Sequence, residues 1–148
     1  MTNAPFIVDT VLDPTREDIA MHTMQVWLHA AKKIGSKTVG TPRQVSFVAR
    51  GADGGIVGGL LAKLQMKVLY IESAWVNPEF QRSGVGVSLR EQVFAFAKAN
   101  DCEYLLATSY EFYDAINYLA KTDPEVEILG QIENCPSPYT LVFLKRKL

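Results

Sequence analysis

The sequence has few of the features that direct a chain to a metal, a membrane or a nucleic acid. Its two cysteines, Cys102 and Cys135, form neither a metal-binding pattern nor a disulfide framework. No apolar run is long enough to cross a bilayer, and Asp9 and Asp13 stand where a signal peptide carries basic residues. A net charge of −1 does not indicate a broadly basic surface. We therefore expect a cytoplasmic protein with no metal, no membrane partner and no nucleic-acid partner.

The composition that remains is that of an ordinary globular protein. Of the 148 residues, 48% are apolar and 21% are charged. A chain of this size can bury a core without disulfides or metals, so residues 1–148 are predicted to form a single domain. We find no repeat, linker or low-complexity segment.

The most informative segment is the loop Gln81–Gly86, which reads Gln-Arg-Ser-Gly-Val-Gly. It follows a strand-like run, 68–76, and precedes a helix-like run, 88–98. A strand, a glycine-bearing loop and a helix in this order make an anion site, because the loop amides and the helix N-terminus point at one place. Gly84 and Gly86 let the backbone approach a bulky ligand. An ordinary turn with glycines for packing is the alternative, and a dinucleotide fingerprint fits less well because it needs three glycines.

The rest of the chain alternates strand and helix patterns. Asp13 is predicted to cap a helix that starts at Pro14 and ends near Gly35. The turn signal Ala52–Gly55 predicts a hairpin, and Gly58-Gly59 indicates a weak spot or bulge in its second strand. The predicted strands are 6–8, 44–50, 56–63, 67–76, 104–108, 126–132 and 139–144, and the later helices are 88–98 and 113–121. This order predicts an α/β fold, with a mixed sheet flanked by helices.

The loop resembles that of the GNAT acyltransferase superfamily. That family reads Gln or Arg, two variable residues, Gly, one variable residue, then Gly or Ala, and Gln81, Gly84 and Gly86 match. The Val-Asn-Pro-Glu-Phe approach at 76–80 is also similar. The resemblance is strongest over 55–106.

Two further segments resemble one bacterial branch of small single-domain members. They are Leu69–Glu72 and the tail 128–148. The resemblance implies a GNAT-like fold, mostly antiparallel, in which the fourth and fifth strands are parallel and splayed apart.

The resemblance also implies acetyl-CoA as co-substrate. The amides of Arg82–Val87 would bind its pyrophosphate, helped by the helix dipole. The backbone of Trp75 and Val76 would bind the pantetheine arm, with the Trp75 side chain expected in the core. The implied contacts are Trp75, Val76, Gln81, Arg82, Ser83, Gly84, Val85, Gly86 and Val87.

Glu72 is the candidate general base. It is a carboxylate within an apolar strand, and alternation is expected to place it on one face with Tyr70, Ala74 and Val76. A buried carboxylate has a raised pKa, which suits a base near neutral pH. A salt-bridged or solvent-facing Glu72 is the alternative.

The general acid is less well defined by the sequence. Family members often use a Tyr in a pattern of Ala, two variable residues, an aromatic and Tyr, but Ala115 places Leu119 at that position. Tyr118, one position early, is our first choice. Tyr113 and the absence of a dedicated acid both stay open.

These observations predict an N-acetyltransferase that moves the acetyl group of acetyl-CoA directly to a primary amine. The acceptor would be a small molecule or a peptide, and a homodimer stays open. The alternative is a non-catalytic acyl-CoA-binding or regulatory module of the same fold, which Leu119 in place of the usual Tyr favours.

Overall fold

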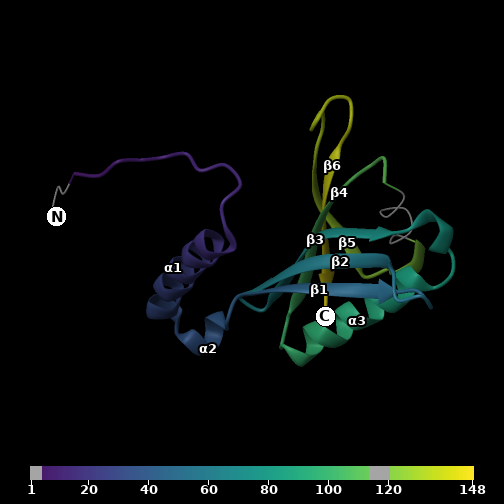
Figure 1. The fold of residues 1–148 in the computed structure, drawn as a ribbon, viewed down its shortest axis with the longest axis horizontal. Coiled ribbons are helices and arrows are strands. Elements are labelled where there is room, and N and C mark those ends of the chain that lie inside the picture. Colours follow the sequence, from purple (N-terminus) through teal and green to yellow (C-terminus); the bar gives the residue numbers. More distant parts are fainter. Residues whose placement is uncertain (1–4, 114–120) are drawn as a thin grey trace.

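The computed structural model describes residues 5–113 and 121–148 (Figure 1). Its helices are α1 (Arg16–Ile34), α2 (Ser36–Val39) and α3 (Val85–Ala99), with a short 3-10 helix, η1 (Pro78–Phe80). Its strands are β1 (Arg43–Arg50), β2 (Ile56–Gln65), β3 (Val68–Val76), β4 (Tyr104–Tyr110), β5 (Val126–Ile132) and β6 (Leu141–Lys147).

The described strands form a six-stranded mixed sheet in the order β1-β2-β3-β4-β6-β5. The β3–β4 pair is parallel and its other neighbouring pairs are antiparallel. This confirms the predicted fold class, a mostly antiparallel sheet with one parallel pair and flanking helices. Asp53-Gly54 does close the β1–β2 hairpin, where Gly51 N donates to Gly55 O at 2.8 Å and Gly54 has φ 82°. A left-handed conformation of this kind favours glycine.

Two sequence predictions about the sheet are wrong. Residues 6–8 form no strand, and their side chains are more than 80% exposed. A strand needs a neighbour for its backbone hydrogen bonds, and this segment lies away from the sheet (Figure 1). Gly58 and Gly59 form no bulge, because both pair regularly with β3. The predicted parallel pair, strands four and five, is therefore β3 and β4. Most of the predicted helix 113–121 lies outside the described residues.

The first helix starts later than predicted. Thr15, rather than Asp13, is the N-cap: the Thr15 hydroxyl accepts from Asp18 N at 3.1 Å, and the Asp18 carboxylate accepts from Thr15 N at 3.1 Å. This reciprocal capping box satisfies two backbone donors that helix starts leave free. The Thr15 hydroxyl, followed by the Thr15 backbone, lowers the pKa of the Asp18 carboxyl. The predicted end at Gly35 is confirmed.

The core lies between α3 and one face of the sheet. Leu89, Val93 and Ala97 recur at helical spacing and are all buried. The Phe47 and Phe96 rings meet edge to face, with centroids 5.6 Å apart. The buried cluster consists of Ala62, Leu64, Leu69, Val93, Ala97, Cys102 and Leu105.

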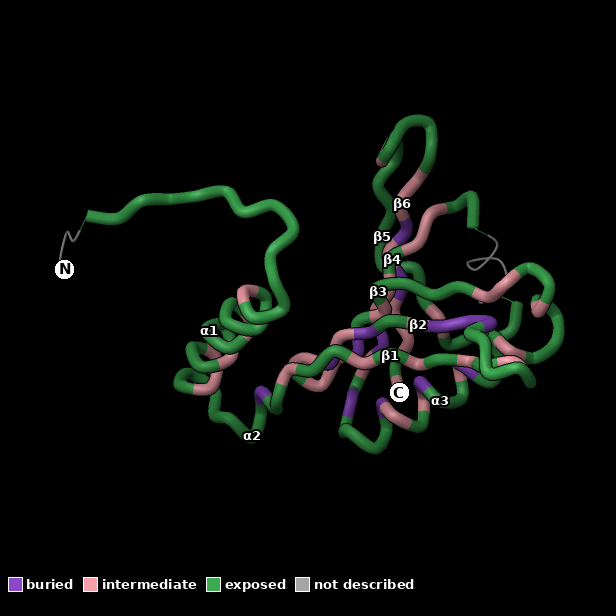
Figure 2. The backbone as a smooth tube through the Cα atoms, viewed as in Figure 1, coloured by how far each residue is buried: buried purple, intermediate pink, exposed green. Residues whose placement is uncertain are grey.

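The opposite face of the sheet is not covered by a described helix (Figure 2). Val48, Leu61, Tyr70 and Trp75 are all exposed on it. α1 stands away from the sheet and buries none of its own residues (Figures 1 and 2).

Candidate active site

The parallel strands β3 and β4 separate halfway along β3. Their ladder runs from Val68 paired with Tyr104 to Ile71 paired with Ala107, and ends there. β3 continues to Val76 beside β2, while β4 continues beside β6. Beyond Ile71, the backbone of β3 therefore faces β4 without a strand partner. Such a gap has unpaired N–H and C=O groups that an extended ligand can bind.

A β-bulge lies at the point of separation. Ile71 pairs with Ala62 and Ser73 pairs with Leu61, which leaves Glu72 as the extra residue. The bulge reverses the alternation that the sequence predicts. Tyr70 shares its face with Ser73 and Trp75 instead of with Ala74 and Val76, since their partners on β2 alternate regularly. Those partners are Lys63 for Tyr70, Leu61 for Ser73 and Gly59 for Trp75.

A hollow of about 580 Å³ opens on this side of the sheet, at the splay. Its lining consists of Lys63, Gln65, Tyr70, Ile71, Glu72, Leu106, Ala107, Thr108, Leu129, Phe143 and Leu144. Glu72 is exposed, so the expectation that it is buried is wrong, because the bulge turns it out of the regular strand. It nevertheless lies in the hollow. The hollow also contains Tyr70, which the sequence reasoning did not select.

The glycine loop ends at the start of α3, later in the chain than the splay. Gly84 is the N-cap, with φ 90°, and has no side-chain hydrogen bond to cap the helix. The first bond of the helix is donated by Ser88 N to Gly84 O at 3.0 Å. The N–H groups of Val85, Gly86 and Val87 therefore have no acceptor within the helix. Together with the dipole of a 15-residue helix, they favour an anion at this end.

The space beside the loop is open to an anionic ligand. A Cβ added at Gly84 or at Gly86 would meet no atom within 4 Å, so the space above both residues is open to a ligand. Two loop side chains are used internally: Gln81 Nε2 donates to Val76 O at 3.3 Å, and the Ser83 hydroxyl donates to Phe80 O. Arg82 is exposed, with φ 63°. The donors available to a ligand are therefore backbone N–H groups and the Arg82 guanidinium.

Trp75 is not in the core, contrary to the prediction. Its side chain is 51% exposed, and its indole nitrogen lies 3.3 Å from where a Cβ of Gly59 would be. The bulge at Glu72 explains this position, because it turns Trp75 to the uncovered face. Val76, at the end of β3, is partly buried.

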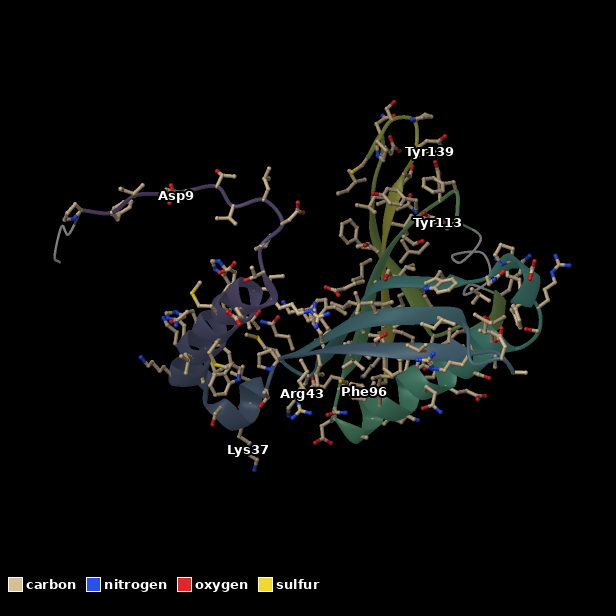
Figure 3. All side chains as sticks on the ribbon, viewed as in Figure 1. Asp9, Lys37, Arg43, Phe96, Tyr113 and Tyr139 are labelled. Atoms are coloured by element: carbon tan, nitrogen blue, oxygen red, sulfur yellow. The ribbon has the colours of Figure 1, made fainter. Side chains whose placement is uncertain are left out.

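The candidates for the general acid are Tyr118 and Tyr113. Tyr118 lies outside the described residues. Tyr113 lies in the turn after β4 and is 55% exposed (Figure 3). Its ring packs at a tilt of 51° against that of Phe112, with ring centroids 4.6 Å apart. Tyr110 and Tyr139 complete this aromatic cluster. Among the tyrosines that the structure describes, Tyr70 lines the hollow and Tyr113 does not.

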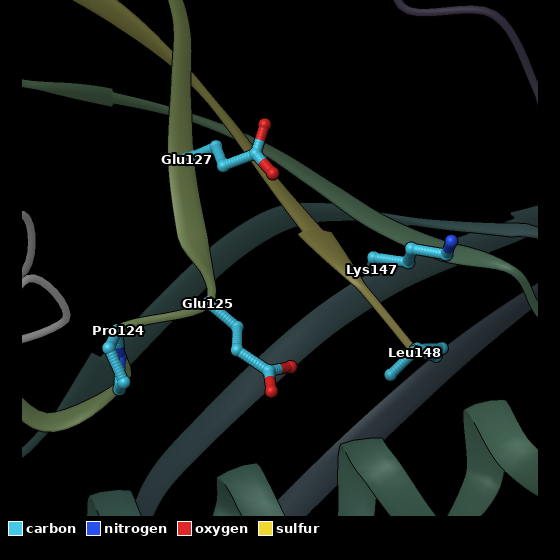
Figure 4. A pocket seen from close by; sticks show the side chains of 5 residues that line it. All are labelled: Pro124, Glu125, Glu127, Lys147 and Leu148. Carbon is cyan, nitrogen blue, oxygen red and sulfur yellow. The ribbon is translucent and has the colours of Figure 1, made fainter.

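A second hollow, of about 370 Å³, lies elsewhere, at the ends of β5 and β6 (Figure 4). Its two acidic residues are both paired, Glu125 with Arg146 at 3.0 Å and Glu127 with Lys145 at 3.1 Å. None of the predicted site residues that the structure describes lines it. Across residues 5–113 and 121–148, we find no group of three side chains suited to hold a metal ion. No helix in that part of the chain has both the length and the apolar character to cross a membrane.

Solved structures of other proteins share this fold. An acetyltransferase from Bacillus cereus has a TM-score of 0.74 at 21% identity, covering 95% of this chain and 98% of its own. A candidate acetyltransferase from Agrobacterium tumefaciens has a TM-score of 0.75 at 16% identity, covering 98% and 100%. A candidate streptothricin acetyltransferase from Bacillus anthracis, solved with acetyl coenzyme A, has a TM-score of 0.63 at 18% identity, covering 76% and 67%.

These likenesses show a shared fold. No curated protein matches the sequence. The model of the acetyltransferase (GNAT) family matches residues 7–122. Since that match covers well over half of the sequence, the chain belongs to the acetyltransferase (GNAT) family.

Proposed function

We propose that this protein is an N-acetyltransferase that uses acetyl-CoA and acetylates a primary amine of a small molecule or peptide. One arrangement supports the proposal most directly. The anion-binding start of α3 follows the strand that separates from β4, and the hollow at the splay contains a carboxylate, Glu72. The cytoplasm, suggested by the composition, supplies such a protein with its donor.

The chain's residues fit the two ends of the donor. The N–H groups of Val85–Val87 and the Arg82 guanidinium would bind the pyrophosphate. The unpaired backbone of β3 at Trp75 and Val76 would hydrogen-bond the pantetheine amides, as an added strand does. Acetyl-CoA supplies an activated thioester. Because the lining of the hollow includes no cysteine, we propose that the acetyl group passes directly to the acceptor.

Glu72 would prepare the acceptor. An amine attacks only when neutral, so the ammonium form must lose a proton first. The Glu72 carboxylate would accept that proton, directly or through a water. Its negative charge at an exposed position also attracts cationic acceptors.

A proton donor for the departing thiolate would complete the reaction. Tyr118 remains our sequence-based candidate. Tyr70 is a second candidate, because its side chain lines the hollow that Glu72 also lines. The two candidates for the proton donor can be distinguished by substitution, since phenylalanine in place of either tyrosine removes the hydroxyl and keeps the ring.

Two measurements test the proposal. Isothermal titration with acetyl-CoA should show binding, and no binding at millimolar ligand would reject the site. A thiol-release assay against a library of polyamines, aminoglycosides, amino acids and peptide amines should identify an acceptor. Identification of the acetylated product by mass spectrometry would then distinguish N-acetylation from hydrolysis of the thioester.

A non-catalytic acyl-CoA-binding module is the second candidate function. Leu119, where family members often carry Tyr, favours it. Binding of acetyl-CoA without thiol release across the whole library would support this candidate over the enzyme.

A further inference from the structure

Two apolar surfaces of this chain lie uncovered in the described residues. One is the sheet face opposite α3, which exposes Val48, Leu61, Tyr70 and Trp75. The other is the arm, defined as residues 5–40, which includes α1 and α2. A sheet face and a helix stripe of this kind are normally buried against each other, because each has an apolar side that water disfavours.

α1 has the stripe that such a contact requires. Ala20, Met24, Trp27, Ala31 and Ile34 recur at spacings of three and four residues, which places them on one side of the helix. None of them is buried. The residues before α1 are equally exposed. The large apolar side chains exposed along the arm are Phe6, Ile7, Val8, Val11, Leu12, Ile19, Met21, Met24, Val26, Leu28 and Ile34.

The solvent-accessible surface area of the chain is larger than that expected of a compact monomer. A compact monomer of 16.4 kDa is expected to expose roughly 7,500 Å². This chain exposes 11161 Å². The excess, roughly 3,600 Å² by the same relation, is more than a stable homodimer interface takes from each partner.

The arm is organised by contacts within itself. Trp27 Nε1 donates a hydrogen bond to Gly40 O, and Val39 is 2% exposed. These contacts hold α2 and the following residue against α1. The connection to β1 then includes Pro42, whose ring restricts its φ. Because the arm stands away from its own sheet (Figure 1), a second copy is the available source of a sheet face for its apolar stripe.

We propose that two copies of this chain exchange their arms, so that α1 of each copy packs on the uncovered sheet face of the other. Reciprocal exchange of one element is a common route to a symmetric dimer. Charge supports the pairing, because the start of the arm carries Asp9, Asp13, Glu17 and Asp18. Cationic side chains border the receiving surface: Arg43 and Arg50 lie at the two ends of the edge strand β1, and Lys63 lies on the face.

The exchange has a consequence for the candidate active site. The hollow at the splay opens on the face that the partner's arm would cover, and Tyr70 belongs to both surfaces. The wall of the hollow would then be completed by the second copy. The dimer itself does not rest on the proposed acetyl transfer, since its evidence is the two uncovered surfaces.

Two measurements on the full chain test the exchange. Sedimentation at micromolar concentration should give about twice 16.4 kDa. Nitrogen-15-labelled and unlabelled chains, unfolded and refolded together, should then give lysine cross-links between the arm (Lys32, Lys33) and the sheet (Lys63) that join one labelled and one unlabelled peptide. A monomer would overturn the proposal. So would a dimer whose arm-to-sheet cross-links all join peptides of the same isotope.

A matched pair of variants identifies the surface. Met24→Asp places a charge in the apolar stripe and should raise the dimer dissociation constant on the order of tenfold or more. Gln25→Asp, about 100° around α1 from Met24 and outside the stripe, should leave it within about twofold. Both positions are exposed, so neither change disturbs the core. Equal effects of the two variants would overturn the proposed face. Acetyl-CoA titration of the same variants reports separately on the loop, which neither substitution touches.

Discussion

Ile71 on β3 and Ala107 on β4 are the last paired residues of the parallel ladder, and the next residue of β3, Glu72, is the bulge. The separation of the strands and the placement of the candidate base therefore have one origin. The extra residue bends β3 and increases its twist, which moves the rest of the strand away from β4. The same residue projects its carboxylate into the hollow that the separation creates.

The glycine loop can be tested with Gly86→Val. A Cβ at Gly86 meets no protein atom within 4 Å, so the variant should fold normally. Its side chain would occupy the space proposed for the phosphates. Loss of one or two charge-assisted hydrogen bonds should weaken acetyl-CoA binding by about tenfold to a hundredfold, measured by titration calorimetry. Gly130→Val, equally open but on β5, is the control and should leave affinity unchanged. Equal affinity in both variants would remove the loop from the site.

Glu72→Gln tests the proposed base. It keeps the size of the side chain and removes its ability to accept a proton. We expect turnover to fall by roughly a hundredfold, with acetyl-CoA affinity nearly unchanged. Steady-state kinetics and calorimetry on the same preparation measure both. Glu91→Gln, an exposed carboxylate on α3, should be indistinguishable from the unmodified chain. A Glu72→Gln variant with full turnover would exclude the role of base.

Tyr70→Phe tests the phenol that the structure places in the hollow. Removal of one hydroxyl that donates to the reacting groups should lower turnover by roughly fivefold without changing thermal stability. Tyr104 lies on β4, on the same face of the sheet as Tyr70 but beside Lys145, and Tyr104→Phe is the matched control. Comparison with Tyr118→Phe assigns the acid, because the larger loss identifies the tyrosine that donates the proton. Full turnover in Tyr70→Phe would leave Tyr70 a wall residue.

The charge cluster at Asp123 should matter for stability. Asp123 is buried, and Arg146 contacts it at 3.1 Å while stacking over Phe94. Arg146→Met would leave a buried carboxylate without its cation, at a cost of about 3 kcal/mol in the free energy of unfolding. Denaturant melts measure this. Glu127→Gln breaks an exposed pair with Lys145 and should cost less than about 1 kcal/mol. Similar losses of unfolding free energy in the two variants would contradict the larger contribution that we assign to the buried pair.

The two thiols should react at different rates. Burial, followed by the charge of Asp101, raises the pKa of the Cys102 thiol, which disfavours the reactive thiolate. In the folded chain, Cys135 should therefore be labelled by a disulfide reagent before Cys102. Because the unfolded thiol ionises first as pH rises, this residue also lowers stability at alkaline pH, beginning at its ordinary pKa. Faster labelling of Cys102 would contradict its burial.

The local pattern of the sequence was enough to predict the central part of the fold. Alternating apolar residues and the Asp53-Gly54 turn predicted the first hairpin, and the runs on either side of the loop Gln81–Gly86 predicted β3 and α3. These features depend on neighbours in the sequence. The backbone conformation of the turn between β2 and β3 is harder to predict, since Met66 and Lys67 both have positive φ without being glycine.

The remaining features depend on contacts between distant segments. The bulge at Glu72 is visible only in the pairing of β3 with β2, so the exposure of Trp75 cannot be predicted from the sequence. The strand predicted at 6–8 has a suitable apolar run, but its formation requires a sheet edge beside it. For this reason the position of the arm could not be predicted from its own residues.

The bulge makes β3 sensitive to length at one position. Deletion of Glu72 would leave Ile71 opposite Ala62 and Ser73 opposite Leu61, so the alternation would become unbroken and the residues from Ser73 to Val76 would keep their present sides of the sheet. The bend and the added twist of the bulge would be lost with the deleted residue. Deletion of Glu72 should therefore close the gap between β3 and β4, whereas a substitution that keeps the extra residue should keep the gap open.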